Sequence, residues 1–172
     1  LFDAPRPAAA QPATEPAAPP APAPAPVVIM SLEELPDPAG RHLALVPLEK
    51  SYSLSYGSNE VFIDPTPAAL AAFLARAGRA AVPSVKALLS ADAAFAAVPL
   101  AVWFDLGLAA YLLNPESRAY AFDRLRDSLF ADPSVDTEGV SPTDNARAAA
   151  LLAEVLAARL ETAGLSRLVA EL

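Results

Sequence analysis

The sequence of 172 residues contains no cysteine and a single histidine, His42. Without cysteine the chain cannot form a disulfide, a thiolate nucleophile or a Cys-ligated zinc site. With one histidine it cannot form a His-pair metal site. The lack of cysteine is compatible with a reducing compartment but does not require one.

Basic residues are also scarce. The chain has 12 Lys and Arg against 20 Asp and Glu, a formal net charge of −8. Because non-specific phosphate binding needs clustered Lys and Arg, this balance disfavours a fragment that binds nucleic acid by itself. The hydrophobic fraction of 54% overstates the core, since 41 residues are alanine and each buries little area.

No leader or membrane span is predicted. The chain begins with Leu1, and no basic segment precedes an apolar run and a small-residue cleavage site. We therefore expect a piece of a longer protein. Residues 93–113 carry one charge, but Asp105 lies within them and Pro99 interrupts them. A buried strand followed by a buried helix is favoured there over a transmembrane span, and no membrane partner is expected.

Composition divides the chain in two. Residues 1–26 contain 9 prolines and 10 alanines, which favours extended polyproline II structure and an interdomain linker. An SH3-type ligand is the alternative, but no basic residues flank a PxxP core. Residues 27–172 have the length of one compact domain.

The domain is predicted to open with a sheet of three or four strands. Tyr52–Tyr56 alternates aromatic or aliphatic residues with serine, and Gly57-Ser58-Asn59 provides turn chemistry before Val61–Ile63, so an antiparallel hairpin is expected. Further strands are predicted at Val27–Met30 and Arg41–Leu48.

Helices dominate the remainder. Thr66-Pro67 resembles an N-cap followed by proline at the first helical position, and predicts a helix up to Gly78. Ser141-Pro142-Thr143-Asp144 repeats this capping pattern before a long helix with an apolar stripe. The other predictions are a short apolar piece at 80–85, helices over 86–97, a strand over Leu100–Val102, a helix over Asp105–Leu113 and a last helix over Leu165–Glu171.

One segment resembles a known family. Phe104–Pro115 is similar to the F-D-x-x-L-A-A-Y-L-L-N-P stretch in the 3'-5' exonuclease domain of bacterial DNA polymerase I, family A, and Tyr120–Leu125 is similar to the family's Y-x-L-D-x-L. The order of the linker, sheet and helices agrees as well. The resemblance covers essentially residues 27–172, and its specific part is Phe104–Pro115. The resemblance implies an α/β, ribonuclease H-like three-layer fold, with a mixed sheet flanked by helices.

The resemblance also implies partners. The parent protein would be a DNA-directed DNA polymerase of replication and repair, and the domain's partners would be the polymerase and 5' nuclease domains of the same chain. DNA would be contacted through the parent, with little or no contribution from this fragment. A cytoplasmic location and a monomeric fragment are expected.

The family's exonuclease holds two metal ions with carboxylates, which activate water and stabilise the leaving 3' oxygen. Its first motif, D-x-E, lies on the first long strand. Alignment of Leu43–Glu49 with that strand places Val46 and Leu48 at the acidic positions. A one-residue shift places Pro47 and Glu49 there, so at most one acid survives.

The other two motifs have also lost their acids. The second, N-x-x-(Y/F)-D, matches Ser84 to Asn and Leu88 to the metal-binding Asp. The third, Y-x-x-x-D, matches Ala148 to Tyr and Leu152 to Asp. Because hard divalent cations need oxygen ligands, the domain is expected to lack exonuclease chemistry. No catalytic, cofactor-binding or metal-binding residue is assigned, and no cofactor is expected.

Two alternatives remain open. Asp136-Thr137-Glu138 spells the D-T-E of the first motif, but it falls in a polar connection and is interpreted as a solvated loop. An active exonuclease would need displaced ligands, namely Glu49, Asp136, Glu138 and Asp144, with Asp132 as a further candidate. The other alternative is an interaction module of an unrelated family that binds a protein partner with its helical faces.

The remaining residues of chemical interest have structural interpretations. His42 is expected at or near the surface, with no paired carboxylate. Trp103 and Phe104 are expected in the core, and Tyr52 and Tyr56 are expected to face a neighbouring helix in preference to stacking a base. The basic residues are too dispersed for a phosphate track; they are Lys86, Arg118, Arg124 and Arg126.

Overall fold

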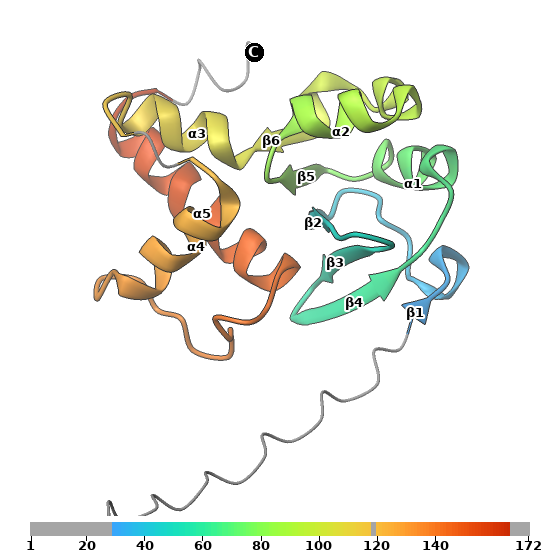
Figure 1. Cartoon of the computed structure of the whole chain (residues 1–172), viewed down its shortest axis with the longest axis horizontal. Helices are drawn as coiled ribbons and strands as arrows, with labels where there is room; N and C mark the ends of the chain where they lie inside the picture. The colour runs from blue at the N-terminus through green and yellow to red at the C-terminus, as the bar shows by residue number, and fades with distance from the viewer. Residues whose placement is uncertain (1–28, 118–119, 166–172) are drawn as a thin grey trace, which may run out of the picture.

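A computed structural model describes residues 29–117 and 120–165. Its centre is a mixed sheet of six strands in the order β1-β4-β3-β2-β5-β6 (Figure 1). The strands are β1 (Ile29–Met30), β2 (His42–Pro47), β3 (Tyr52–Tyr56), β4 (Asn59–Ile63), β5 (Arg79–Val82) and β6 (Trp103–Asp105).

Strands β2, β3 and β4 form an antiparallel meander, which confirms the predicted hairpin. Gly57 at its turn has a φ of 61°, a conformation that glycine adopts without steric cost. Strand β1 lies parallel to β4, so the first four strands do form one sheet. Strands β5 and β6 extend the sheet on the other side of β2, and both pairings there are parallel.

Helices and short 3-10 turns connect and cover these strands. Thr66 caps α1 as predicted, since its side-chain oxygen accepts a hydrogen bond from the Ala69 amide at 3.3 Å. The helical elements are η1 (Leu32–Glu34), α1 (Pro67–Leu74), α2 (Val85–Ala91), η2 (Ala93–Ala97), η3 (Leu100–Val102), α3 (Leu106–Leu113), α4 (Phe122–Ala131) and α5 (Ala146–Thr162).

The sheet is buried on both faces. Successive residues of β2 point to opposite sides: Leu43 and Leu45 join an apolar cluster with α1, α2 and η2, whereas Ala44 and Val46 join one with α3, α4 and α5. Figure 1 shows these two helix groups on either side of the sheet. We refer to them as the α1/α2 face and the α3/α5 face. The α/β class with a mixed sheet is therefore confirmed.

Two element predictions are wrong. Leu100–Val102 is the 3-10 turn η3, closed by a hydrogen bond from the Val102 amide to the Pro99 carbonyl, and the strand begins only at Trp103, which pairs with Ala80 of β5. The sequence Ser141–Asp144 does not cap α5, which begins at Ala146. The Ser141 amide instead bonds to the Asp144 carboxylate within the preceding loop.

Some predictions lie outside the described residues: the linker 1–26, Val27 and Val28 of the first strand, and the last helix beyond Leu165. Within the part of the chain that the structure describes, no helix is long and apolar enough to cross a membrane. Residues 93–113 divide instead among η2, η3, β6 and α3.

Candidate functional site

The residues matched to the first exonuclease motif lie at the carboxyl end of β2, the edge at which open α/β sheets bind their ligands. Val46 is 6% exposed and packs in the apolar cluster of the α3/α5 face. Leu48 follows the end of β2 and lines an open hollow of about 520 Å³. Glu49 lines the same hollow, so one acid of the shifted alignment does lie there.

Leu88, matched to the acid of the second motif, also lines this hollow. Its side chain is 3% exposed and belongs to the cluster of the α1/α2 face. Ser84, matched to the motif's Asn, is the N-cap of α2, and its hydroxyl accepts a hydrogen bond from the Ala87 amide at 3.3 Å. Of the two residues matched to the second motif, Ser84 thus caps α2 and Leu88 anchors α2 in the core.

The charges in the hollow do not favour a phosphate ligand. Glu49 and Asp64 contribute two carboxylates against the single ammonium of Lys50. Tyr52 also lines the hollow, and burial raises the pKa of its phenol, helped by the negative charges of Asp92 and Asp64. The Tyr52 ring stands edge-on to Phe95 of η2, with centroids 6.4 Å apart. It therefore packs against a neighbouring helical element, as predicted.

Both positions of the third motif lie in α5. Ala148 is fully buried, and Leu152 is 4% exposed in the same apolar cluster as Val46. The structure thus brings Val46 together with Leu152, and Leu48 together with Leu88, but none of the four supplies an oxygen. These residues do not fit a pair of divalent cations.

Small residues let α5 lie directly on the sheet. Ala146, Ala149 and Ala153 of α5 are each at most 2% exposed, and the helix contacts β2, β3 and β5. Four of the buried sheet residues on this face are also small, namely Ala44, Ala81, Ser53 and Ser55, and they lie beside the larger Val46 and Phe104. The helix therefore packs closely on β2 and β3 and covers Val46 near the end of β2, whereas Leu48, just beyond that end, lines the open hollow.

The start of α5 is bound by a carboxylate from a distant strand. Glu60 of β4 accepts hydrogen bonds from the backbone amides of Asn145 and Ala146 at 3.0 and 3.2 Å, and lies 3.5 Å from that of Arg147. The hydroxyl of Ser53 bonds to Glu60 and also accepts from the Ala146 amide. A negative charge at a helix N-terminus is favourable because the first amides lack intrahelical partners. Sequence reasoning missed this cap, because its residues lie 85 positions apart.

Asp136 and Glu138 do not assemble a metal site. Asp136 accepts a hydrogen bond from the Glu138 amide at 2.9 Å, a local turn in an exposed loop. Asp144 is held by Arg147 at 3.1 Å. Asp132 bonds to Ser134 and Arg159, and these contacts lower its pKa to about 2. Among residues 29–117 and 120–165, no three His, Asp or Glu side chains gather so that they could hold a metal ion.

Asp105, in the segment that carries the family resemblance, has a structural role. Its carboxylate accepts from the Leu108 amide at 2.9 Å, which caps α3, and from the Val85 amide at 2.8 Å, at the start of α2. Gly107 lies close by: a Cβ there would be 3.3 Å from the carbonyl oxygen of Pro83. One carboxylate therefore holds the beginnings of two helices together.

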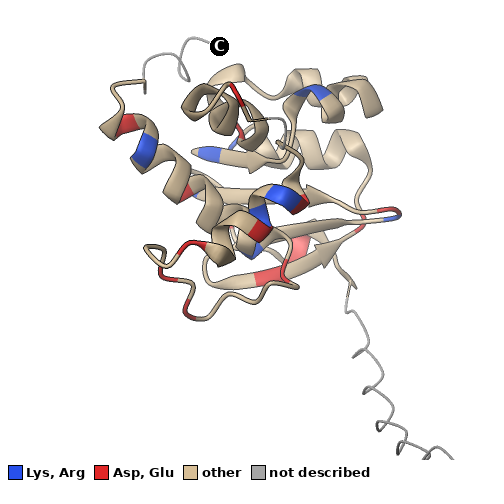
Figure 2. Ribbon diagram, turned by 60° about the vertical axis from the view of Figure 1, so that its left-hand side comes forward, with Lys and Arg blue, Asp and Glu red and all other residues tan. Residues whose placement is uncertain are grey.

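The remaining predicted residues lie apart from any common site. His42 is exposed at the start of β2, and Phe104 is buried on the α3/α5 face. Tyr56 is buried and donates its hydroxyl to the Asp37 carbonyl at 2.8 Å. Arg126 stacks on Phe122 of its own helix. In Figure 2 the Lys and Arg positions are spread over several elements and interrupted by Asp and Glu, so the described part of the chain shows no continuous basic track.

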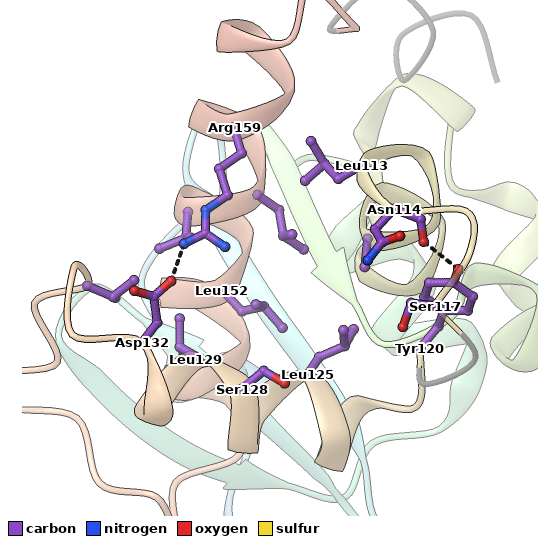
Figure 3. Close-up of a pocket in the computed structure, with 14 residues that line it drawn as sticks. Leu113, Asn114, Ser117, Tyr120, Leu125, Ser128, Leu129, Asp132, Leu152 and Arg159 are labelled. Carbon is purple, nitrogen blue, oxygen red and sulfur yellow. Dashed lines mark hydrogen bonds and ion pairs between the residues drawn. The ribbon is translucent and has the colours of Figure 1, made fainter.

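A second hollow, of about 420 Å³, lies between α3, α4 and α5 (Figure 3). Its walls are mostly aliphatic, and we call it the three-helix groove. The ion pair of Asp132 with Arg159 stands at one end, and the hydroxyl of Tyr120 donates to the Asn114 carbonyl at the other, at 2.6 Å. The aliphatic lining residues are Ala110, Leu113, Leu125, Leu129, Val135, Leu152, Val155 and Leu156.

Compared with protein-family models, with curated proteins and with solved structures, the chain gives no match.

Proposed function

We propose that this chain is a catalytically inactive, 3'-5' exonuclease-like scaffold domain of a bacterial DNA polymerase I. In this proposal the domain has a ribonuclease H-like fold and no metal chemistry. It joins a 5' nuclease domain to a polymerase domain and supports the latter by packing. The parent protein would act in DNA replication and repair in the cytoplasm.

The strand order supports this fold. The ribonuclease H-like sheet is an antiparallel three-stranded meander extended, beside its first strand, by two parallel strands. Here β2, β3 and β4 form such a meander, and β5 and β6 continue the sheet next to β2 in parallel. Helices cover both faces, and α5 lies over β2, where the third motif helix of the family would be expected.

The observation that carries the proposal is the burial of the matched acidic positions. Val46, Leu88 and Leu152 are 6%, 3% and 4% exposed and pack among apolar side chains. A carboxylate placed at any of them would lose its hydration without a compensating charge, which costs several kcal/mol in practice. The packing favours the apolar residues that are present, and a scaffold role accounts for them.

The scaffold role has a direct test in a nuclease assay. A 5'-labelled single-stranded oligonucleotide is incubated with the whole chain and Mg²⁺ or Mn²⁺. We expect no 3' shortening above the protein-free reaction, and no rise of the melting temperature with either metal. Metal-dependent shortening that disappears in Asp136→Ala but persists in the matched variant Asp127→Ala would show an active exonuclease with displaced ligands.

The membership in a polymerase is tested separately by the flanking sequence of the intact gene. A 5' nuclease before Leu1 and a polymerase after Leu172 are expected. If neither is present, the interaction-module alternative is favoured, whatever the nuclease assay shows.

A further inference from the structure

The outer surface of the helices on the α1/α2 face carries almost no charge. Of the 13 exposed residues in α1, α2, η2 and η3, only Lys86 is charged. Helices α4 and α5 differ, since six of their ten exposed residues are charged. Figure 2 shows the same contrast: red and blue positions are frequent along α4 and α5, whereas the helices at the upper right are almost entirely tan.

These exposed residues lie on neighbouring elements. Helices α1 and α2 both contact η2, and η3 begins three residues after the end of η2. We call this the uncharged helical surface. Besides Lys86, its exposed residues are Ala68, Ala69, Ala72, Ala87, Leu89, Ser90, Ala91, Ala93, Ala96, Ala97, Leu100 and Ala101.

The surface is apolar at its centre and polar at its margin. Its large apolar side chains are Leu100 and Leu89, which are 70% and 36% exposed. The Asp92 carboxylate, between α2 and η2, accepts a hydrogen bond from the Ala94 amide at 2.8 Å. Arg76, just beyond the end of α1, is paired with Asp37 at 2.6 Å. An exposed apolar area with a polar rim is typical of a protein–protein contact.

Charge favours a second copy of the chain as the occupant. A twofold dimer places one surface against the same surface of its partner, so a charged surface would face its own charges. The uncharged helical surface has no exposed carboxylate, although the chain has a net charge of −8. Because α4 and α5 lie on the other side of the sheet, two copies that meet at this surface keep the carboxylates of those helices apart (Figure 1).

We propose that two copies of the chain associate through the uncharged helical surface, as a twofold dimer with Leu100 in the contact. Stable interfaces contain about 20–30 residues on each side, whereas this surface has 13, so the dimer should dissociate on dilution. The proposal departs from the monomeric fragment expected from the sequence. It rests on packing and charge and does not depend on the exonuclease resemblance.

Sedimentation velocity of the whole chain tests this dimer, over about 10 μM to 1 mM. The weight-average sedimentation coefficient should rise with concentration towards the dimer value. Leu100→Asp places a charge in the contact and should raise the dissociation constant at least about tenfold. Ala158→Asp adds the same charge to the exposed side of α5 and should leave the dissociation constant nearly unchanged. Far-UV circular dichroism checks that each chain is folded, and Leu89→Asp replaces Leu100→Asp if that variant is not.

Salt separates this dimer from one that is held by opposite charges. Raising NaCl from about 0.05 to 0.5 M screens the repulsion between two chains of the same net charge. The dissociation constant of the proposed dimer should therefore fall severalfold. A dimer held by ion pairs between α4 and α5 of two copies would dissociate more readily instead.

Four results would overturn the proposal. One is a chain that stays monomeric over the whole concentration range, because another partner would then have to cover the surface. Another is an equal effect of the aspartates at 100 and 158, since the contact would then not lie on η3. The third is weaker association at high salt. The fourth is growth beyond the dimer, which a closed twofold contact does not allow.

Discussion

The two faces of the sheet solve the same packing problem with side chains of different size. On the α1/α2 face the sheet presents Leu43, Leu45 and Leu54, and bulky residues of α1 and η2 cover them. On the α3/α5 face it presents the small residues Ala44, Ala81 and Ser53 beside Val46 and Phe104, and the alanines of α5 lie directly on the small ones. The sheet residues named on both faces are buried. Large residues hold the helices off the first face, and small ones bring α5 onto the second.

This difference affects where a ligand-binding site could lie above the sheet. A cleft above a sheet needs side chains or a ligand to keep helix and strands apart. Of the positions matched to metal-binding acids, Val46 is covered by α5 and Leu152 belongs to α5, whereas Leu48 and Leu88 line the open hollow. The small-residue face is therefore occupied by a closely packed helix.

The largest expected effect comes from opening a cavity on the bulky face. Leu45 is fully buried at the centre of β2, so Leu45→Ala should lower the free energy of unfolding by about 2–5 kcal/mol. Leu100, which is 70% exposed, is the control: Leu100→Ala should change it by less than about 0.5 kcal/mol. Urea denaturation measures both. Equal losses would mean that this face is not tightly packed.

On the small-residue face the opposite change should be harmful. Ala149 is fully buried against the sheet, so Ala149→Leu should cost about 1–3 kcal/mol by overpacking. Ala158→Leu, at an exposed position of the same helix, should be within about 0.5 kcal/mol of the parent chain. Thermal melts compare the two. A neutral Ala149→Leu would show that α5 has room to move away from the sheet, and would contradict close packing there.

The cap that holds α5 in place gives a smaller effect. Glu60→Gln keeps one oxygen acceptor but removes the negative charge and half of the amide bonding, so a loss of about 0.5–2 kcal/mol is expected. Hydrogen exchange of the Ala146 and Arg147 amides should accelerate. Glu161→Gln, at the exposed end of α5, is the matched control and should change neither quantity. Unchanged exchange at Ala146 in Glu60→Gln would refute the capping role.

The smallest effect depends on pH. Bonds to Ser134 and Arg159 lower the pKa of Asp132 from 3.8 to about 2, so the folded state favours its ionised form. This stabilisation is fully present above pH 3.8 and disappears as the pH falls through about 2. The melting temperature of Asp132→Asn should therefore be slightly below that of the parent chain near pH 6, and the two should converge as the pH falls below about 2. Asp127→Asn, at an exposed position of α4, should show no such convergence.

Local signals predicted the elements that depend on nearby residues. The hairpin follows from alternation and the Gly57 turn, and α1 follows from the Thr66 cap. The serines of β3 show the limit of this approach. Alternation of Ser53 and Ser55 with larger residues is typical of a strand with one solvated face, yet both serines are buried under α5. Small size, not polarity, is what this face requires, and that requirement comes from a helix about 90 residues later.

The site was predictable in a different way. The alignment with the family motifs stays a prediction; the fold shows that two of its positions, Val46 and Leu152, pack together and that two others, Leu48 and Leu88, share a hollow. The Glu60 cap and the three-helix groove carry no local signal. Both are made from segments that meet only when the sheet and helices assemble.

The Asp105 carboxylate accepts two hydrogen bonds, one from the start of α2 and one from the start of α3, and this affects how a sequence resemblance is interpreted. The segment that most resembles a polymerase exonuclease is the one in which an aspartate joins two helices, next to a glycine that lets a carbonyl approach. In this chain these contacts join the beginnings of α2 and α3. Asp105 is therefore accounted for by its place in the fold, and catalytic activity has to be judged from other parts of the molecule.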